Sequence, residues 1–294
     1  MGFKTTFRRG WVSQLLLGLV LVGTVRGEIS STNRPFAGIT YYAETRTQPP
    51  TRMFVAEIDL TNPNVRLHVS PGGPDPDGTG PWQTTLMQPT RIAARDGFDL
   101  VVNGDFFRIK EAEGTNSTFR SARWSAVTGP AASNGRIWST SASKRPCLVV
   151  RKDGKASIEM IGQPGTDAWE VVSGNTMLVE DGKIVPQQNK VRHPRTAVGL
   201  NADTTKLILL VVDGRKPGVA IGMNYDELAA EFIRLGCNDA VNLDGGGSSV
   251  MAVRDPARSS FTILNQPTDG RERAVANVLG ISTRKPVSSE TQPR

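Results

Sequence analysis

Cysteine and histidine are scarce in this chain, and the motifs of several common hydrolases are missing. The 294 residues include two cysteines, Cys147 and Cys237, and two histidines, His68 and His193. Neither cysteine belongs to a metal-binding spacing, and no CxxC, HExxH or GxSxG motif occurs. Zinc hydrolysis and serine-triad chemistry therefore lack their usual signatures. Two alternatives stay open for the cysteines, a disulfide in an oxidising compartment or two buried thiols.

Blocks of like charge and long apolar segments are missing after residue 27. The formal net charge is +7, but the four basic residues before residue 27 (Lys4, Arg8, Arg9 and Arg26) contribute more than half of it. The rest of the chain is only mildly basic, and its aromatic residues are not interleaved with basic ones. We therefore expect no nucleic-acid partner and no membrane span in the mature chain, whose oligomeric state the sequence leaves open.

The N-terminus has the order of a secretory signal peptide. A basic head is followed by an apolar run from Trp11 to Val25 and by small residues ending at Gly27. We interpret residues 1–27 as a signal peptide, so that a secreted or periplasmic chain starts near Glu28. The pair Arg8-Arg9 leaves twin-arginine export as the alternative route. At the other end, residues 285–294 are polar and contain proline, which predicts a disordered tail.

The pattern of the mature chain predicts one α+β domain with mixed or antiparallel sheets and a few helices. Residues 28–98 are expected to supply N-terminal strands and a helix, with a hairpin of strands over 53–69 and the helix at 83–96. His68 lies in the second strand of that hairpin and is interpreted as an ordinary strand residue. Residues 71–81 and 110–143 are expected to be a loop and a long excursion with short strands.

The second half of the chain carries the clearest pattern. Asn224 with Glu227 three residues later predicts a capped helix that Gly236 ends. Asp181-Gly182 suits a hairpin turn. Apolar runs predict buried strands at 99–103, 206–212 and 239–243. Further strands are expected at 147–150, 157–161 and 169–172, alternating with turns, and at 250–253.

The most informative segment for function is Asp244-Gly245-Gly246-Gly247, which is followed by Ser248 and Ser249. Glycine lets a backbone turn sharply and approach a ligand closely, and successive N–H groups in such a turn can bind an anion such as phosphate. The alternative interpretation is a glycine-rich hairpin that binds no ligand.

Two further carboxylates, Asp105 and Asp213, also follow predicted strands, so three carboxylates could meet at one end of the strands. Glycoside cleavage uses a pair of such groups. When the leaving group is a phosphate, an acid matters less and nearby positive charge matters more. Arg195 and Arg215 suit that role because a guanidinium matches phosphate oxygens, although each could be a surface charge. His193 is a candidate acid, base or phosphate donor, with a structural role as the alternative.

Four segments together resemble the phosphodiester glycosidase family: VVNGDFF (101–107), HPRTAVG (193–199), LLVVDGR (209–215) and NYDELAAEFIRLGCNDAVNLDGGGSS (224–249). The similarity covers residues 99–281, and we take residues 99–284 as the family domain. It implies cleavage of the glycosyl C–O bond of a sugar 1-phosphodiester of the N-acetylglucosamine 1-phosphate type. Free sugar and a phosphomonoester would be the products.

By resemblance, the pocket contains catalytic candidates Asp244, Asp213, Asp105 and His193, and substrate-binding candidates Asn103, Arg195, Arg215, Gly245, Gly246, Ser248 and Ser249. No cofactor and no metal ligand are predicted, although calcium held by aspartates and carbonyls stays open as an alternative. A signal peptide followed by this domain resembles the bacterial members, for which an envelope or extracellular glycopolymer is the expected substrate. Two rival hypotheses are a non-catalytic glycopolymer-binding protein and a metal-assisted phosphodiesterase that cuts the P–O bond.

Overall fold

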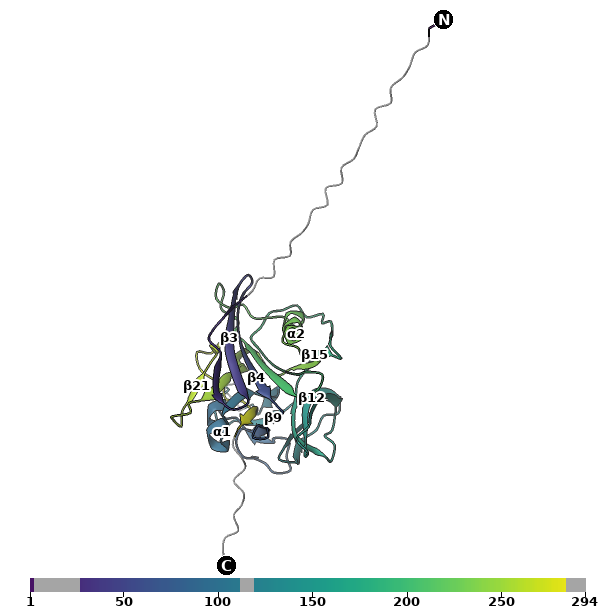
Figure 1. The fold of residues 1–294 in the computed structure, drawn as a ribbon. Coiled ribbons are helices and arrows are strands. Elements are labelled where there is room, and N and C mark those ends of the chain that lie inside the picture. Colours follow the sequence, from purple (N-terminus) through teal and green to yellow (C-terminus); the bar gives the residue numbers. More distant parts are fainter. Residues whose placement is uncertain (3–26, 112–118, 284–294) are drawn as a thin grey trace, which may run out of the picture.

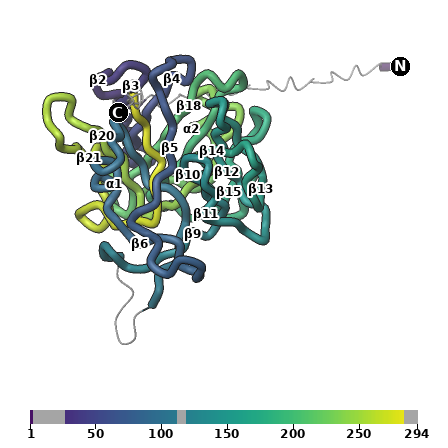
Figure 2. Tube along the Cα trace, turned by 90° about the horizontal axis from the view of Figure 1, so that it is seen from below, coloured from purple at the N-terminus to yellow at the C-terminus, as the bar shows by residue number. Residues whose placement is uncertain are grey.

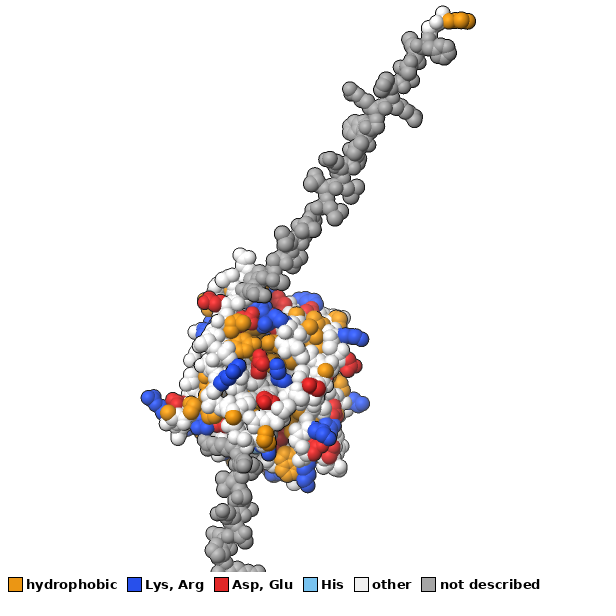
Figure 3. Space-filling model, viewed as in Figure 1, with side chains coloured by type: hydrophobic (Ala, Val, Ile, Leu, Met, Phe, Trp, Pro, Cys, Tyr) orange, Lys and Arg blue, Asp and Glu red, His pale blue; other side chains and the backbone are white. Residues whose placement is uncertain are grey.

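The computed structural model describes residues 1–2, 27–111 and 119–283. The predicted signal peptide, except residues 1, 2 and 27, and the predicted tail lie outside the described residues. Within the described part, no helix is long and apolar enough to cross a membrane. Charged side chains of both signs are interspersed over the face shown in Figure 3, with neither sign forming a large patch there.

The largest sheet has nine strands and runs through the middle of the molecule (Figure 1). Its order is β1-β3-β4-β18-β17-β19-β15-β16, with β2 paired to β3. Its strands are β1 (Glu28–Ile29), β2 (Asn33–Phe36), β3 (Ile39–Thr47), β4 (Pro50–Asp59), β15 (Thr176–Glu180), β16 (Lys183–Ile184), β17 (Arg195–Leu200), β18 (Lys206–Val212) and β19 (Asp239–Asn242).

Three smaller sheets complete the fold. One has the order β21-β20-β7-β22-β5, made of β5 (Arg66–Pro71), β7 (Leu100–Asn103), β20 (Met251–Arg254), β21 (Phe261–Ile263) and β22 (Asn277–Ser282). The second has the order β11-β10-β14-β12-β13, made of β10 (Ala131–Ser133), β11 (Arg136–Ser139), β12 (Arg145–Arg151), β13 (Ala156–Ile161) and β14 (Ala168–Ser173). The third consists of β6 (Thr84–Thr85), β9 (Trp124–Val127) and β8 (Phe107–Ile109).

The predicted fold class is confirmed in a mostly β form. The described residues contain two α-helices, α1 (Pro89–Asp96) and α2 (Tyr225–Arg234), and every sheet is antiparallel. In Figure 2, β20 and β21 lie on one side of the molecule, β12 and β13 on the other, and β5 between them. Because β5 contacts both β10 and β14, the two five-stranded sheets lie side by side under the large sheet.

Strand β18 shows why its sequence is a continuous apolar run. Leu207, Leu209 and Val211 belong to the main core between the large sheet and the smaller ones. The alternate residues, including Ile208 and Leu210, belong to a second core under α2. A strand buried on both faces needs apolar side chains at every position.

Helix α2 covers this second face closely. A Cβ on Gly199 of β17 would come within 2.6 Å of the Phe232 ring and 2.9 Å of Cys237 Sγ, so only glycine lets the helix approach. Ion pairs to the buried carboxylates of Glu44 and Glu231 also join α2 to β3, since Arg234 binds Glu44 at 2.7 Å and Arg46 binds Glu231 at 2.9 Å.

The cysteines are both free and buried, in different core clusters. Cys147 packs on β12, and Cys237 packs below α2. Of the two alternatives, the structure therefore shows two buried thiols. Burial raises the pKa of both thiols, that of Cys237 to about 12, which makes them unreactive at neutral pH.

The predicted hairpin over residues 53–69 is wrong. β4 and β5 belong to different sheets, and the turn near Pro63 carries the chain from one sheet to the other. The alternation persists across the turn because both strands face the same core: Phe54 and Ile58 lie on one side of it, and Leu67 and Val69 on the other.

The helix predicted at 83–96 ends as expected but starts later. Gly97 has φ 74° and closes α1, whereas Gln88 is extended and Pro89 occupies the first turn. Thr84 and Thr85 pair with β9 instead. The hairpin turn at Asp181-Gly182 is confirmed: both residues have positive φ, as a two-residue turn between β15 and β16 requires.

The capped start of α2 is confirmed and supports a stability prediction. The Asn224 side chain accepts a hydrogen bond from Glu227 N at 2.9 Å, and the Glu227 carboxylate accepts one from Asn224 N at 3.0 Å. We expect Asn224→Ala to lower the free energy of unfolding by about 1 kcal/mol, because a cap of this kind is worth that amount. Urea denaturation measures it. Asn224→Asp keeps the acceptor and should lose much less, so an equal loss in both variants would contradict this role.

Candidate functional site

The predicted site residues come from strand ends that meet at one end of the sheets. In the large sheet Arg195 pairs with Val212, and Ala197 pairs with Asn242, so β17 begins where β18 and β19 end. In the neighbouring sheet Met251 pairs with Val102, so β20 begins where β7 ends. The segments around residues 104, 213 and 244 are consequently collected at this end.

Asn103 ties these strand ends together. Its side-chain amide donates to the Asp244 carbonyl at 2.7 Å. Its side-chain oxygen accepts from Thr196 Oγ1 at 2.7 Å and from Val250 N at 3.2 Å. The residue is fully buried, and these bonds hold the loop after β19 between the two sheets. Asn103 therefore positions the loop and has no free face toward solvent.

The loop 244–249 is not a hairpin. It connects β19 of the large sheet with β20 of the neighbouring sheet and contains one 3-10 turn, Gly246–Ser248. Gly246 has φ 64°, and its N–H donates to the Pro194 carbonyl at 2.9 Å. A Cβ on Gly245 would lie 2.8 Å from the same carbonyl oxygen. Glycine is required at both positions by conformation or by close approach.

Two guanidinium groups lie against this loop. A Cβ on Gly246 would be 3.0 Å from Arg215 Nη2, and a Cβ on Gly247 would be 1.9 Å from Arg273 Nη2. Arg215 is exposed, has φ 60°, and forms no ion pair with any described carboxylate. Its guanidinium is therefore available to an anion that enters the loop.

Arg273 was not predicted from the sequence. It is bound by Asp269 at 2.9 Å, and its guanidinium lies 3.9 Å from the centre of the Phe119 ring. The other polar residues of the site follow predicted strands, whereas Arg273 precedes β22 by four residues. In the sequence it stands in Arg271-Glu272-Arg273, which resembles an ordinary charged surface segment.

Asp244 is the first residue of the loop, lies within range of the Arg273 charge and is half-buried. Its carboxylate accepts a hydrogen bond from Gly245 N at 2.8 Å. Burial raises the pKa of Asp244 to about 6, while hydrogen bonds from Ser248 and Gly245 and the charge of Arg273 oppose that rise. The group is thus mostly ionised at neutral pH and close enough to its pKa to exchange a proton.

Arg195 is engaged by the protein itself. Its Nε donates to the Met223 carbonyl at 2.9 Å and its Nη2 to the Val191 carbonyl at 3.0 Å, and its guanidinium lies 4.1 Å from the centre of the Tyr225 ring. It is 5% exposed. This guanidinium braces the segment around His193 and leaves less of its edge for a phosphate than Arg215 does.

Several buried polar atoms around the loop have no hydrogen-bond partner among the described residues. They are His193 Nδ1, Asp213 Oδ2, Asn242 Oδ1 and Ser249 Oγ. Buried polar groups are normally satisfied, so a concentration of unsatisfied ones indicates a place for water or ligand. Burial and the charges of Arg195 and Arg215 lower the pKa of His193, which makes its ring neutral at pH 7.

Asp213 adjoins the loop, whereas Asp105 is closed off. Asn265 donates both to Asp213 Oδ1 at 3.3 Å and to the Ser249 carbonyl at 3.0 Å, which brings Asp213 to the far end of the loop. Asp105 is 1% exposed, and its oxygens accept from Ser173 N at 3.0 Å and from Asn277 Nδ2 at 2.6 Å. Burial raises the pKa of Asp105 to about 7. Its side chain joins β14 to β22 and does not reach the open face of the loop.

A cavity of about 690 Å³ opens next to Arg273, and its walls include Arg120, Arg271 and Phe119. Within the loop, Ser248 is buried and its side chain forms a hydrogen bond with Asp244. Within the described ranges no group of three His, Cys, Asp or Glu side chains is placed to hold a metal ion.

Residues 96–282 match the family model of the phosphodiester glycosidases. The chain belongs to this family. Among curated proteins, an uncharacterised prophage-derived protein of Bacillus subtilis, YomE, is 40% identical over 92 residues, which are 31% of this phosphodiester glycosidase chain and 13% of that protein. The chain therefore spans only a small part of that relative, which contributes no function.

Solved structures show the same fold in other organisms. The catalytic domain of zebrafish N-acetylglucosamine-1-phosphodiester α-N-acetylglucosaminidase has a TM-score of 0.61 and 21% identity, over 88% of this chain and 89% of that one. A Burkholderia pseudomallei protein described as exported has a TM-score of 0.63 and 14% identity, over 87% and 96%. At these sequence identities, the similarity shows a shared fold and nothing about substrate or activity.

The two loop arginines lead to a binding prediction. If Arg215 and Arg273 form an anion site, inorganic phosphate should bind the protein, and Arg273→Ala should weaken that binding about tenfold, as expected for a lost charged hydrogen bond. Isothermal titration calorimetry measures it. Gly247→Ala should act in the same direction because its methyl group displaces the Arg273 guanidinium. Arg258→Ala, which removes an exposed arginine elsewhere, should leave the affinity unchanged, and an equal loss in that variant would contradict the assignment.

Proposed function

We propose that this protein hydrolyses the glycosyl C–O bond of a sugar 1-phosphodiester. The observation that carries the proposal is the loop 244–249, which begins with a carboxylate, Asp244, and has two guanidinium groups, Arg215 and Arg273, packed against its glycines. The carboxylate suits a reaction at an anomeric carbon, and the two guanidinium groups suit the phosphate attached to that carbon. Membership of the phosphodiester glycosidase family supports the same reaction class.

In this proposal Asp244 faces the anomeric carbon and Asp213 assists it. The oxygen of a water molecule bonds to that carbon while the glycosyl C–O bond breaks, the bond electrons leave with the phosphate oxygen, and one of these carboxylates accepts the proton that the water loses. The products are free sugar and a phosphomonoester. Arg215 and Arg273 offset the charge that develops on the departing phosphate, an effect that typically contributes on the order of 10²–10³ in rate per donor. The neutral ring of His193 can donate a hydrogen bond to a phosphate oxygen.

The substrate class we propose is an exported glycan with N-acetylglucosamine 1-phosphate-like units. The zebrafish structural neighbour is named for removing α-N-acetylglucosamine from a 1-phosphodiester, and the Burkholderia neighbour is described as exported. The N-terminal sequence of this chain points to the same compartment. An envelope or extracellular glycopolymer therefore fits better than a nucleotide or a nucleic acid.

The position of bond cleavage tests the reaction directly. The protein is incubated with an α-N-acetylglucosaminyl phosphodiester in ¹⁸O-water, and the products are analysed by mass spectrometry. We expect the label in the sugar, because water attacks carbon. Asp244→Asn should lose at least about two orders of magnitude in rate, since it removes the charged group nearest the reacting carbon.

Two other results would each establish a different function for this protein. Label in the phosphate, together with loss of activity in a chelator, would establish P–O cleavage by a metal-assisted phosphodiesterase. Saturable binding without product would establish a glycopolymer-binding protein. Asp203→Asn, an exposed carboxylate in the turn between β17 and β18, is the matched control and should retain full rate.

The pH dependence follows from the pKa of Asp244. Its value of about 6 is raised by burial, so acidification protonates the carboxylate and removes the reactive form. We expect kcat/KM to fall as the pH drops through about 6. The positive charge of Arg273 lowers this pKa, so Arg273→Ala should move the acid limb to higher pH in addition to slowing the reaction. An acid limb that stays in place in this variant would contradict the contact between the two groups.

A further inference from the structure

A second cavity lies at the opposite end of the large sheet from the loop 244–249. It has a volume of about 660 Å³, and its walls include the turn residue Thr204 between β17 and β18 and the segment Leu60–His68. The candidate active site begins after Val212, at the other end of β18. Because β18 has seven residues, the two ends are about 20 Å apart. No lining residue of this cavity belongs to the site already described.

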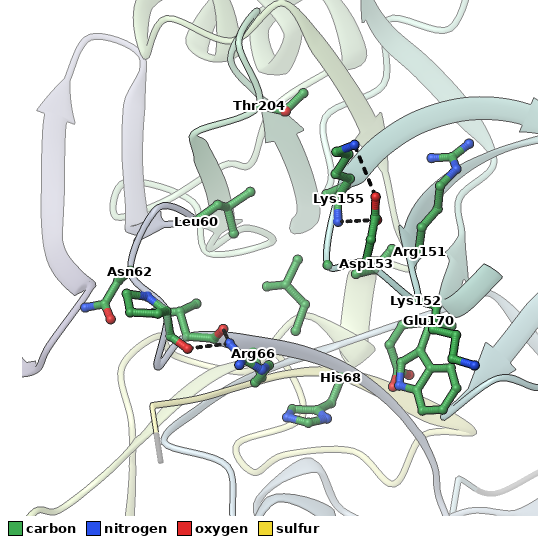
Figure 4. Close-up of a pocket in the computed structure, with 17 residues that line it drawn as sticks. Leu60, Asn62, Arg66, His68, Arg151, Lys152, Asp153, Lys155, Glu170 and Thr204 are labelled. Carbon is green, nitrogen blue, oxygen red and sulfur yellow. Dashed lines mark hydrogen bonds and ion pairs between the residues drawn. The ribbon is translucent and has the colours of Figure 1, made fainter. Parts of the chain in front are cut away.

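The cavity is assembled from segments far apart in the sequence. The loop after β4, strand β5, the turn between β12 and β13, and the start of β14 each supply a wall. Figure 4 shows Leu60 and Arg66 on one side of the open space, with Asp153 and Lys155 on another. Leu67, Val150 and Ala156 are buried core residues that form an apolar floor.

Trp169 supplies an aromatic wall. It is 38% exposed, although every other residue of β14 is buried. A Cβ on Gly135 would lie 2.8 Å from Trp169 Cε3 and Cζ3, so the ring packs against the β10–β11 turn. The Gly135 N–H also donates to the Trp169 carbonyl at 2.8 Å. The β10–β11 turn thus holds the indole on one side, and Trp169 is an exposed aromatic residue in the cavity lining.

The charged lining is predominantly basic. Four basic side chains, Arg66, Arg151, Lys152 and Lys155, face two acidic residues, Asp153 and Glu170. Lys155 pairs with Asp153, and Arg151 pairs with Glu159 and Asp167.

Arg66 and Lys152 have no carboxylate partner among the described residues. Arg66 is anchored by the Pro63 and Val65 carbonyls, both at 2.7 Å. Glu170 is buried and accepts hydrogen bonds from Val69 N and Asn134 N, so it does not neutralise them from within the cavity. An anionic ligand is favoured here.

We propose that this cavity is an accessory binding site for an acidic glycan, separate from the site of hydrolysis. The apolar C–H face of a pyranose ring stacks on the Trp169 indole, and a carboxylate or phosphate on the same glycan pairs with Lys152 and Arg66. A flat, pre-ordered aromatic ring with a few convergent polar groups is the arrangement that binds a sugar with little loss of side-chain entropy.

The test measures binding without turnover. Isothermal titration calorimetry on the mature protein compares three probes: an oligogalacturonate, which is an acidic sugar; a malto-oligosaccharide, which is a neutral sugar; and polyphosphate, which is an anion without sugar rings. We expect the oligogalacturonate to bind best. Trp169→Ala should lower the affinity for the oligogalacturonate about tenfold, because loss of an aromatic side chain that the ligand covers has an effect of this size. Trp169→Phe should recover part of the loss.

Control variants separate this site from general surface charge. Lys152→Glu should lower the affinity for the oligogalacturonate and reduce the salt dependence of its binding, with little effect on the affinity for the malto-oligosaccharide. Met160→Ala, an exposed apolar residue on neighbouring β13 that does not line the cavity, should have no effect. Equal affinity for polyphosphate would overturn the proposal, as would oligogalacturonate binding that is unchanged in Trp169→Ala. The result does not depend on the hydrolytic activity, which the Asp244→Asn assay tests separately.

Discussion

The hydrogen bonds of the Asn103 side chain are the constraint on which the site depends. This one buried amide binds the loop at the Asp244 carbonyl, strand β17 at Thr196, and the start of β20 at Val250 N. The amide itself is fully buried, and an unsatisfied amide there would cost about 1–3 kcal/mol. The loop therefore has one favourable position relative to both sheets, and the Asp244 carboxylate takes its place from it.

Much of the fold was predictable because single strands impose strong local patterns. The apolar run 206–212 corresponds to β18, and the Asn224–Glu227 capping box corresponds to the start of α2. Which strands pair with one another was harder to predict from the sequence. β4 and β5 alternate in the same way as a hairpin, yet they face each other across the core from different sheets. Periodicity reveals which face of a strand is buried, but not what buries it.

The candidate site shows the same division. The sequence indicated Asp244 and the glycines, because a triple glycine after a strand is a local feature. The use of each polar group depends on distant partners that no local pattern reveals. Ser173 and Asn277 enclose Asp105, main-chain carbonyls occupy most of Arg195, and Arg273 reaches the loop from a segment that resembles ordinary surface. Roles proposed from residue type alone must therefore be reconsidered once these partners are known.

Arg273 is held in place by other contacts than those that hold the loop 244–249. Asp244 is tied through Asn103 to the buried framework, whereas Arg273 is supported by Asp269 and Phe119 near the rim of a cavity. Changes at the rim can alter which molecule is accepted without disturbing the carboxylate. In a scaffold built in this way, the composition of the rim can vary while the position of the carboxylate stays fixed.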